Sequence, residues 1–176
     1  MIRYSYFRCE YPLKENVFFN LLEKIPPSFR TKILKFKRWE DRYTSLMGKI
    51  LLRHLLISIG YSDDCLQKLT IGEYGKPFID GNVDFNISHS DGFVVCAISD
   101  SSNIGVDTEK IVEFDINSVL DILRQDEKEK LLRNFSLDIF YDFWTKKESV
   151  IKAMGRGVYF GDVGPVVSAS TGQLFR

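Results

Sequence analysis

Residues 143–155 read FWTKKESVIKAMG, a stretch that combines a helical pattern with a concentrated set of charges. Apolar residues recur at helical spacing over 137–154, and Gly155 stands where a helix C-cap is expected. Glu148 and Lys152 are one turn apart, so they share one face of the predicted helix. Such a pair is also the commonest surface ion pair on helices, so its meaning depends on the rest of the chain.

A second charged motif, GVDTE at 105–109, lies upstream in a predicted strand over 104–109. Alternate residues of an extended strand point the same way, so Asp107 and Glu109 present two carboxylates together. With Glu148 they form a set of oxygen ligands that is typical of a Mg²⁺ site bridging to substrate phosphates. A solvated strand end is the alternative interpretation of this motif.

The remaining sequence predicts an α+β protein with helices at both ends and a β-rich middle. We expect helices over 15–24, 28–37, 40–59, 116–123, 126–134 and 137–154, and strands over 2–8, 69–71, 77–79, 83–88, 93–99 and 104–109. The Asp-Gly pairs at 80–81 and 91–92 favour tight hairpin turns. The middle of the chain is therefore predicted to be an antiparallel meander that ends at the pair of carboxylates.

Composition favours a soluble intracellular protein of one domain or two small lobes. The chain has 176 residues, of which 44% are hydrophobic, and its 24 basic residues equal its 24 acidic ones. This neutral balance gives no sign of a nucleic-acid or membrane partner. We expect Cys9, Cys65 and Cys96 to be packing residues in a reducing compartment. Without a signal peptide or a membrane span in the sequence, a cytoplasmic location is expected.

Four blocks, taken in order, resemble the signature motifs of 4′-phosphopantetheinyl transferases, and the surfactin-synthetase-activating type is the most similar. The blocks are GKP at 75–77, FNISHS at 85–90, IGVDTE at 104–109, and WTKKES at 144–149 followed by Lys152. The ordered set is far more specific than any single block. The resemblance covers roughly residues 40 to 157.

This resemblance implies a pseudo-dimer of two similar small lobes, each an antiparallel sheet packed on a long helix, with the active site between them. The first lobe would span residues 1–106, and the second, residues 107–176, would be incomplete. Residues 158–176 can supply one hairpin at most. A naturally short protein, a truncated one, or a homo-oligomer whose second chain completes the sheet would each account for this.

The resemblance also implies a reaction. The phosphopantetheine arm of coenzyme A would pass to a serine of an apo acyl or peptidyl carrier protein, releasing adenosine 3′,5′-bisphosphate. Mg²⁺, or Mn²⁺ in its place, would be held by Asp107, Glu109 and Glu148. Glu148 would accept the serine proton, Lys152 would protonate or stabilise the departing phosphate, and Lys147 would contact the phosphates.

Further residues are assigned by the same resemblance. Coenzyme A would contact Gly75, Lys76, Pro77, Ser88 and His89, with the histidine near the 3′-phosphate, and a carrier helix would dock on Ile111, Val112 and Phe114. Many relatives carry a phosphate-binding arginine where Thr44 stands, so either Arg42, in the basic stretch over 30–42, substitutes for it in binding coenzyme A, or this contact is missing.

Each assignment has a plainer alternative. His89 could equally be a core histidine, and the basic stretch could be a solvated helix face. Residues 111–116 could form a buried linker. Ser88 and His89 do not form a hydrolase dyad, because adjacent strand residues point to opposite faces. A coenzyme A or carrier-binding protein without turnover, or a Mg²⁺-dependent nuclease, remain alternative functions.

Overall fold

The computed structural model describes residues 1–120 and 123–155 of an α+β protein. The helices are α1 (Glu15–Leu22), α2 (Pro27–Leu34), α3 (Trp39–Ser58), α4 (Gln125–Arg133) and α5 (Leu137–Met154), with short 3-10 helices η1 (Cys65–Lys68) and η2 (Ile116–Ser118). The strands are β1 (Ile2–Arg8), β2 (Thr70–Ile71), β3 (Pro77–Phe78), β4 (Asp84–Ser90) and β5 (Phe93–Ser99).

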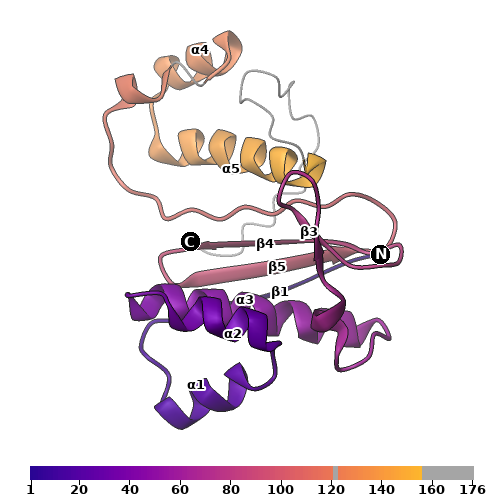
Figure 1. Cartoon of the computed structure of the whole chain (residues 1–176). Coiled ribbons are helices and arrows are strands. Elements are labelled where there is room, and N and C mark those ends of the chain that lie inside the picture. Colours follow the sequence, from indigo (N-terminus) through magenta and orange to yellow (C-terminus); the bar gives the residue numbers. More distant parts are fainter. Residues whose placement is uncertain (121–122, 156–176) are drawn as a thin grey trace.

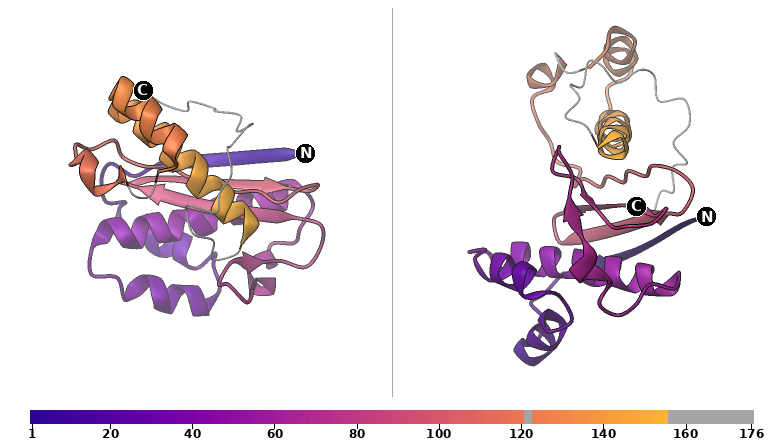
Figure 2. Two further views of the ribbon diagram at one scale, coloured as in Figure 1. Left: turned by 90° about the horizontal axis from the view of Figure 1, so that it is seen from above. Right: turned by 45° about the vertical axis from the view of Figure 1, so that its right-hand side comes forward.

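One antiparallel sheet of order β1-β5-β4 lies at the centre of the molecule. Helix α3 covers one face of this sheet, and α5 lies on the opposite side, beyond the connection that follows β5 (Figure 1). The further views show the same layers, with α5 crossing above the strands (Figure 2). Strands β2 and β3 form a separate two-stranded hairpin.

The order of the strands follows from their sequences. β5 reads FVVCAIS and is buried along almost its whole length, as expected of a central strand covered on both faces. β1 alternates between exposed and half-buried residues, which suits an edge strand. Gly48 brings α3 close to the sheet, since an added Cβ would lie 3.0 Å from Ile87 Cγ2.

Two hydrophobic clusters fill the described part of the chain. The larger contains buried residues between Phe18 and Ile98 and lies between α3 and the sheet. The smaller is centred on Leu123, Leu131 and Phe140, in and around α4 and α5. All three cysteines are free and buried, which confirms their prediction as packing residues.

The predicted helices at 15–24, 28–37, 40–59, 126–134 and 137–154 and the predicted strands up to residue 99 are confirmed with small shifts of their ends. Gly60 and Gly155 follow their helices with left-handed φ angles of +100° and +63°, as helix termination requires. Of the helix predicted over 116–123, the 3-10 helix η2 is described, and residues 121–122 lie outside the described part.

The prediction of a sheet strand over 104–109 is wrong. This segment crosses the face of β4 instead of extending the sheet edge, and its backbone N–H groups bond to side chains, so no strand ladder forms. The expected meander is also corrected, because β1, from the N-terminus, completes the sheet beside β5. The hairpin predicted within 158–176 lies outside the described residues.

Within residues 1–120 and 123–155, no helix combines the length and the apolar character needed to cross a lipid bilayer.

Candidate active site

The site begins with side chains of β4 that alternate along one face of the strand. Each holds a backbone N–H of the segment 104–110: Asp84 Oδ2 accepts from Ile104 N at 2.7 Å, Asn86 Oδ1 from Val106 N at 3.1 Å, and Ser90 Oγ from Lys110 N at 3.0 Å. Because strand side chains repeat every two residues, this row of acceptors matches an extended partner segment. The carboxylates of that segment are thereby fixed over β4.

Asp107 meets both β4 and α5. Ser88 Oγ donates to Asp107 Oδ1 at 2.9 Å, and Lys152 Nζ lies 2.5 Å from the same oxygen and 3.1 Å from Ser88 Oγ. The Asp107 side chain is 2% exposed, so this ion pair is largely shielded from water. Three residues from three separate parts of the sequence thus converge, and Lys152 is directed into the protein instead of lying on a solvated helix surface.

Glu148 and Glu109 add two further carboxylates. Burial raises the pKa of Glu148, the negative charges of Asp107 and Glu109 raise it further, and Lys152 opposes them. A carboxylate with a raised pKa is a stronger proton acceptor while it stays ionised. Glu109 is exposed, and its Oε2 accepts a hydrogen bond of 3.0 Å from Ser90 Oγ.

No group of three or more His, Cys, Asp and Glu side chains is arranged closely enough to hold a metal within the described residues. The site nevertheless fits a hard divalent cation. Asp107 Oδ2 is buried without a hydrogen-bond partner, and the repulsion from Asp107 and Glu109 that raises the Glu148 pKa is what a bound cation would relieve.

Lys76 links the hairpin to both sides of the site. Its Nζ lies 2.7 Å from Asp84 Oδ2, 3.5 Å from the carbonyl oxygen of Ile104 and 3.4 Å from that of Ala153 in α5. Gly75, with φ of +82°, forms the turn before it, and Pro77 begins β3. This motif therefore connects β4, the segment 104–110 and α5 at one end of the site.

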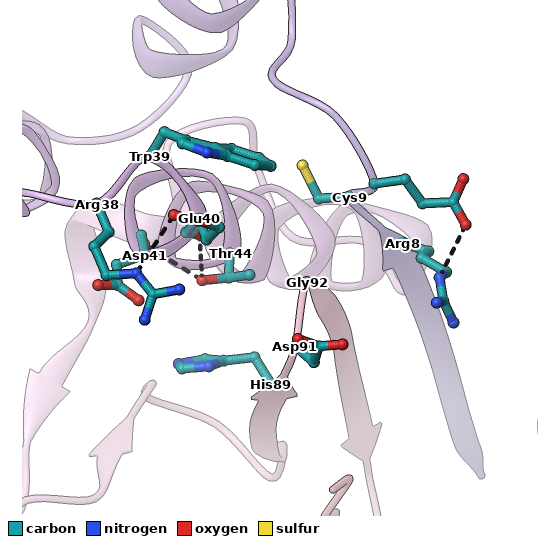
Figure 3. A pocket seen from close by; sticks show the side chains of 11 residues that line it. Arg8, Cys9, Arg38, Trp39, Glu40, Asp41, Thr44, His89, Asp91 and Gly92 are labelled. Atoms are coloured by element: carbon teal, nitrogen blue, oxygen red, sulfur yellow. Dashed lines mark hydrogen bonds and ion pairs between the residues drawn. The ribbon is translucent and has the colours of Figure 1, made fainter. Parts of the chain in front are cut away.

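His89 lies on the face of β4 opposite to Ser88, as strand alternation requires. Its ring extends below the first turn of α3 into a pocket of about 550 Å³ (Figure 3). The pocket lining includes Arg8, Arg38, Trp39, Thr44 and His89, together with Glu10, Glu40, Asp41 and Asp91. His89 is exposed, so the alternative of a buried core histidine is excluded.

Two family models match consecutive parts of the chain. The model for "4′-phosphopantetheinyl transferase, N-terminal" matches residues 11–101, and the model for "4′-phosphopantetheinyl transferase superfamily" matches residues 103–166. The chain belongs to the 4′-phosphopantetheinyl transferase superfamily. The family predicted from the four sequence blocks is confirmed.

Curated relatives align with most of the length of the transferase. It is 34% identical to the 4′-phosphopantetheinyl transferase gsp of Aneurinibacillus migulanus over 90% of this chain and 68% of that protein. It is also 34% identical to 4′-phosphopantetheinyl transferase Sfp of Bacillus subtilis (strain 168), over 84% of this chain and 67% of the relative. An L-aminoadipate-semialdehyde dehydrogenase-phosphopantetheinyl transferase of Mus musculus is 28% identical over 88% of this chain and 58% of that protein.

Two cations predicted to contact coenzyme A, Lys147 and Arg42, have protein partners in the structure. Lys147 is 1% exposed, and its Nζ lies 2.6 Å from Glu127 Oε2. It precedes Glu148 by one residue, and one residue is about 100° of helical rotation, so Lys147 faces α4. Arg42 Nε donates to the carbonyl oxygen of Phe36 at 2.7 Å, and Arg42 is not among the residues that line the His89 pocket.

The predicted carrier-binding residues of the transferase divide into two kinds. Ile111 and Val112 are exposed, with 50% and 47% of their surfaces accessible. Phe114 packs against Phe140, with ring centroids 4.5 Å apart, and belongs to the edge of the smaller hydrophobic cluster. The linker alternative therefore suits Phe114 and not Ile111 or Val112.

Several contributors to the transferase site were missed from sequence. Ser90 bonds to Glu109, Asp84 and Asn86 hold the segment 104–110, and Gly105 lies against the backbone of α5. A signal for the first three exists in the sequence, because polar residues alternate with apolar ones from Asp84 onward. Gly105 could be recognised only once the approach of α5 was known.

Proposed function

We propose that the transferase moves the phosphopantetheine arm of coenzyme A to a serine hydroxyl of an apo acyl or peptidyl carrier protein, releasing adenosine 3′,5′-bisphosphate. The observation that carries this proposal is the convergence of Lys152, Asp107 and Ser88 at 2.5–3.1 Å, beside Glu148. A phosphate ester repels nucleophiles, so its transfer needs positioning and neutralisation of charge, and this cluster supplies groups for both.

Asp107, Glu109 and Glu148 are the residues that would hold Mg²⁺ or Mn²⁺. When bound, the cation would neutralise the pyrophosphate of coenzyme A. The unpartnered Oδ2 of Asp107 and the raised pKa of Glu148 support this assignment.

The roles of Glu148 and Lys152 follow from their charges. The carrier serine oxygen attacks the phosphorus atom next to pantetheine, and the bond from that phosphorus to the bridging oxygen breaks. Glu148 accepts the serine proton, for which its raised pKa makes it suitable. Lys152 stabilises or protonates the departing phosphate oxygen with its ammonium group.

We assign the His89 pocket to the nucleotide end of coenzyme A. Trp39 offers an aromatic surface, and His89 and Arg38 offer hydrogen-bond donors for the 3′-phosphate. Arg38 Nε lies 3.5 Å from Glu40 Oε2, and the other N–H groups of the Arg38 guanidinium supply further donors for a phosphate. Ser88, Gly75, Lys76 and Pro77 would lie toward the pyrophosphate, on the opposite side of β4 from His89.

A carrier protein would dock on the exposed apolar residues Ile111 and Val112, which follow the carboxylate segment within a few residues. The division into two lobes near residue 106, with the site between them, is supported by the two hydrophobic clusters. A cytoplasmic location, the absence of nucleic-acid or membrane partners, and a homo-oligomer that completes a second sheet stay predictions.

The test is to incubate the protein with Mg²⁺, coenzyme A and a panel of apo carrier proteins, and to weigh each carrier intact by mass spectrometry. A gain of one phosphopantetheine is expected. It should be lost with EDTA, and the rate should fall at least about 100-fold in Glu148→Gln, because the proton acceptor is removed. Glu129→Gln, an exposed carboxylate on α4, is the matched control and should keep full activity.

Two results would contradict the proposed transfer reaction. Coenzyme A binding without a mass gain on any carrier would identify a binding protein without turnover. Cleavage of DNA by the wild type and not by Glu148→Gln would instead support the nuclease alternative.

A further inference from the structure

Two serines of β4 are in register with two carboxylates of the segment that crosses it. Ser88 and Ser90 are two residues apart, as are Asp107 and Glu109, and each serine donates to one carboxylate, at 2.9 Å and 3.0 Å. The equal spacing arises because both segments are extended and therefore have the same two-residue repeat. Ser88 also contacts Lys152 Nζ of α5, whereas Ser90 also accepts a hydrogen bond from the backbone N–H of Lys110.

Ser90 is held in one orientation by its two contacts. A serine hydroxyl has a single proton, and here this proton is directed to Glu109 Oε2. A lone pair of the same oxygen accepts from Lys110 N at 3.0 Å. Ser90 therefore fixes both the carboxylate of Glu109 and the backbone directly after it.

The backbone around Ser90 is fixed by a tight turn and by a neighbouring ion pair. It is the last residue of β4 and precedes the Asp91-Gly92 turn, in which both residues have positive φ, 46° and 78°. A turn of this kind joins neighbouring strands tightly and matches their twist. Asp91 Oδ2 also lies 2.9 Å from Lys110 Nζ, so the turn and the carboxylate segment are connected at two neighbouring positions.

Glu109 needs such a support more than Asp107 does. Asp107 is 2% exposed and is held by Ser88 and Lys152, whereas Glu109 is exposed. A glutamate side chain that is free in water loses rotamer entropy when it binds a cation, and a hydrogen bond that orients it beforehand reduces this cost. The hydrogen bond described for the Glu109 carboxylate, from Ser90, is to Oε2. Oε1 is therefore available for a ligand.

We propose that Ser90 is a positioning residue of the transfer site, which orients Glu109 toward the divalent cation. The inference rests on the proposed function only for the identity of the cation site. Removal of a hydrogen bond to a metal-binding carboxylate typically lowers metal affinity by about 10–100-fold. Loss of the Ser90 hydroxyl is therefore expected to act on affinity for the cation more than on the rate at saturating cation.

The experiment compares Ser90→Thr with Ser90→Val, which have nearly the same shape and differ by the hydroxyl group. Binding of free Mn²⁺ is measured by electron paramagnetic resonance, with and without coenzyme A. We expect affinity within about twofold of wild type for Ser90→Thr and about 10-fold weaker binding for Ser90→Val. Ser58→Ala, on α3 at the far side of the sheet, is the control and should bind as wild type.

Transfer rates against Mg²⁺ concentration give the second measurement. The Mg²⁺ needed for half-maximal rate should rise about 10-fold in Ser90→Val, and excess Mg²⁺ should restore most of the rate. Thermal unfolding of each variant separates this effect from a loss of stability.

Equal Mn²⁺ affinity in Ser90→Thr and Ser90→Val would overturn the inference, even if both unfold at a lower temperature, because the role of Ser90 would then be structural. Absence of Mn²⁺ binding in the wild type would overturn it as well. If the wild type binds Mn²⁺ but transfers nothing, the proposed function fails, whereas the Thr-to-Val difference in affinity still decides the role of Ser90.

Discussion

At the scale of single residues, the site depends on the absence of a side chain at Gly105. A Cβ at this position would lie 1.8 Å from the carbonyl oxygen of Ser149 and 2.6 Å from the backbone nitrogen of Ala153. Gly105 is not among the described residues with positive φ, so space and not backbone conformation requires glycine. This contact of backbone with backbone sets the distance between Asp107 and Lys152.

Gly105→Ala is expected to push the segment 104–110 away from α5. Transfer should fall about 100-fold or more, because misplacement of reacting groups by about 1 Å costs that much, and overpacking should reduce stability by about 1–3 kcal/mol. The measurements are carrier modification by mass spectrometry and urea unfolding.

The control for Gly105→Ala is Gly60→Ala, where φ is +100° and no atom lies within 4 Å of an added Cβ. This variant should lose stability through backbone strain and keep its turnover. Full turnover in Gly105→Ala would show that the close approach to α5 is not required.

At the scale of elements, the contact of α3 with β5 places an amine beside a thiol. Burial lowers the pKa of Lys49, the charge of Cys96 opposes this, and Lys32 lowers the pKa further. Burial raises the pKa of the Cys96 thiol to about 12, so Cys96 stays neutral at ordinary pH. The Lys49 ammonium therefore gains little from the thiol, and its Nζ lies 5.4 Å from the centroid of the Phe29 ring.

Lys49→Met is expected to raise the free energy of unfolding near pH 7. A lysine whose folded pKa is below its unfolded value destabilises the folded state fully below the folded pKa, and this cost disappears as pH rises toward the unfolded value near 10.4. The advantage of the variant should therefore shrink as pH rises above the lowered folded pKa toward about 10. Urea unfolding at several pH values measures it, and a less stable variant at pH 7 would contradict the expectation.

Elements with strong local signals were predictable from sequence. Helix α5 ends at Gly155, as its pattern predicts, and β5 was recognised from an apolar run between turn residues. The segment 104–109 has the same extended pattern, yet it forms no strand, because its partners are side chains of β4 rather than a neighbouring backbone. Alternation in the sequence identifies an extended segment but not the groups that form hydrogen bonds with its backbone.

The residue types of the site were predictable from sequence, but their contacts were not. The carboxylates Asp107, Glu109 and Glu148 could be recognised from motif and charge. The burial of Lys147 could not, because it depends on how α4 packs against α5 and brings Glu127 to it. Ser90 stood inside a recognised motif, but its contact with Glu109 requires the path of a segment that follows it by about twenty residues.

At the scale of the whole molecule, the two hydrophobic clusters differ in size and in what stabilises them. The larger cluster joins buried hydrophobic residues from Phe18 to Ile98, whereas the smaller has three buried hydrophobic residues among those described and lies near the buried ion pair of Lys147 and Glu127. Glu127 Oε2 also accepts from Arg124 N at 2.9 Å at the start of α4. The part that carries Glu148 and Lys152 thus depends on a polar interaction more than the part that carries the sheet.

Lys147→Met alone is expected to destabilise the α4–α5 region by about 3–5 kcal/mol, because a buried carboxylate loses its cation. The double variant Glu127→Leu with Lys147→Met should recover most of this loss. Hydrogen exchange should show faster exchange in α4 and α5 of the single variant, with α3 and β5 unchanged. Equal loss of protection in α3 and β5 would indicate one cooperative unit instead of two.

The extent of the larger cluster has a consequence for the order in which a growing chain acquires its chemistry. Every buried residue described in that cluster has been synthesised by Ile98. Asp107 follows immediately, but Lys152, its partner across the site, is 45 residues further on. On the ribosome, the residues of the larger cluster are therefore available before the charge of Lys152 that completes the site.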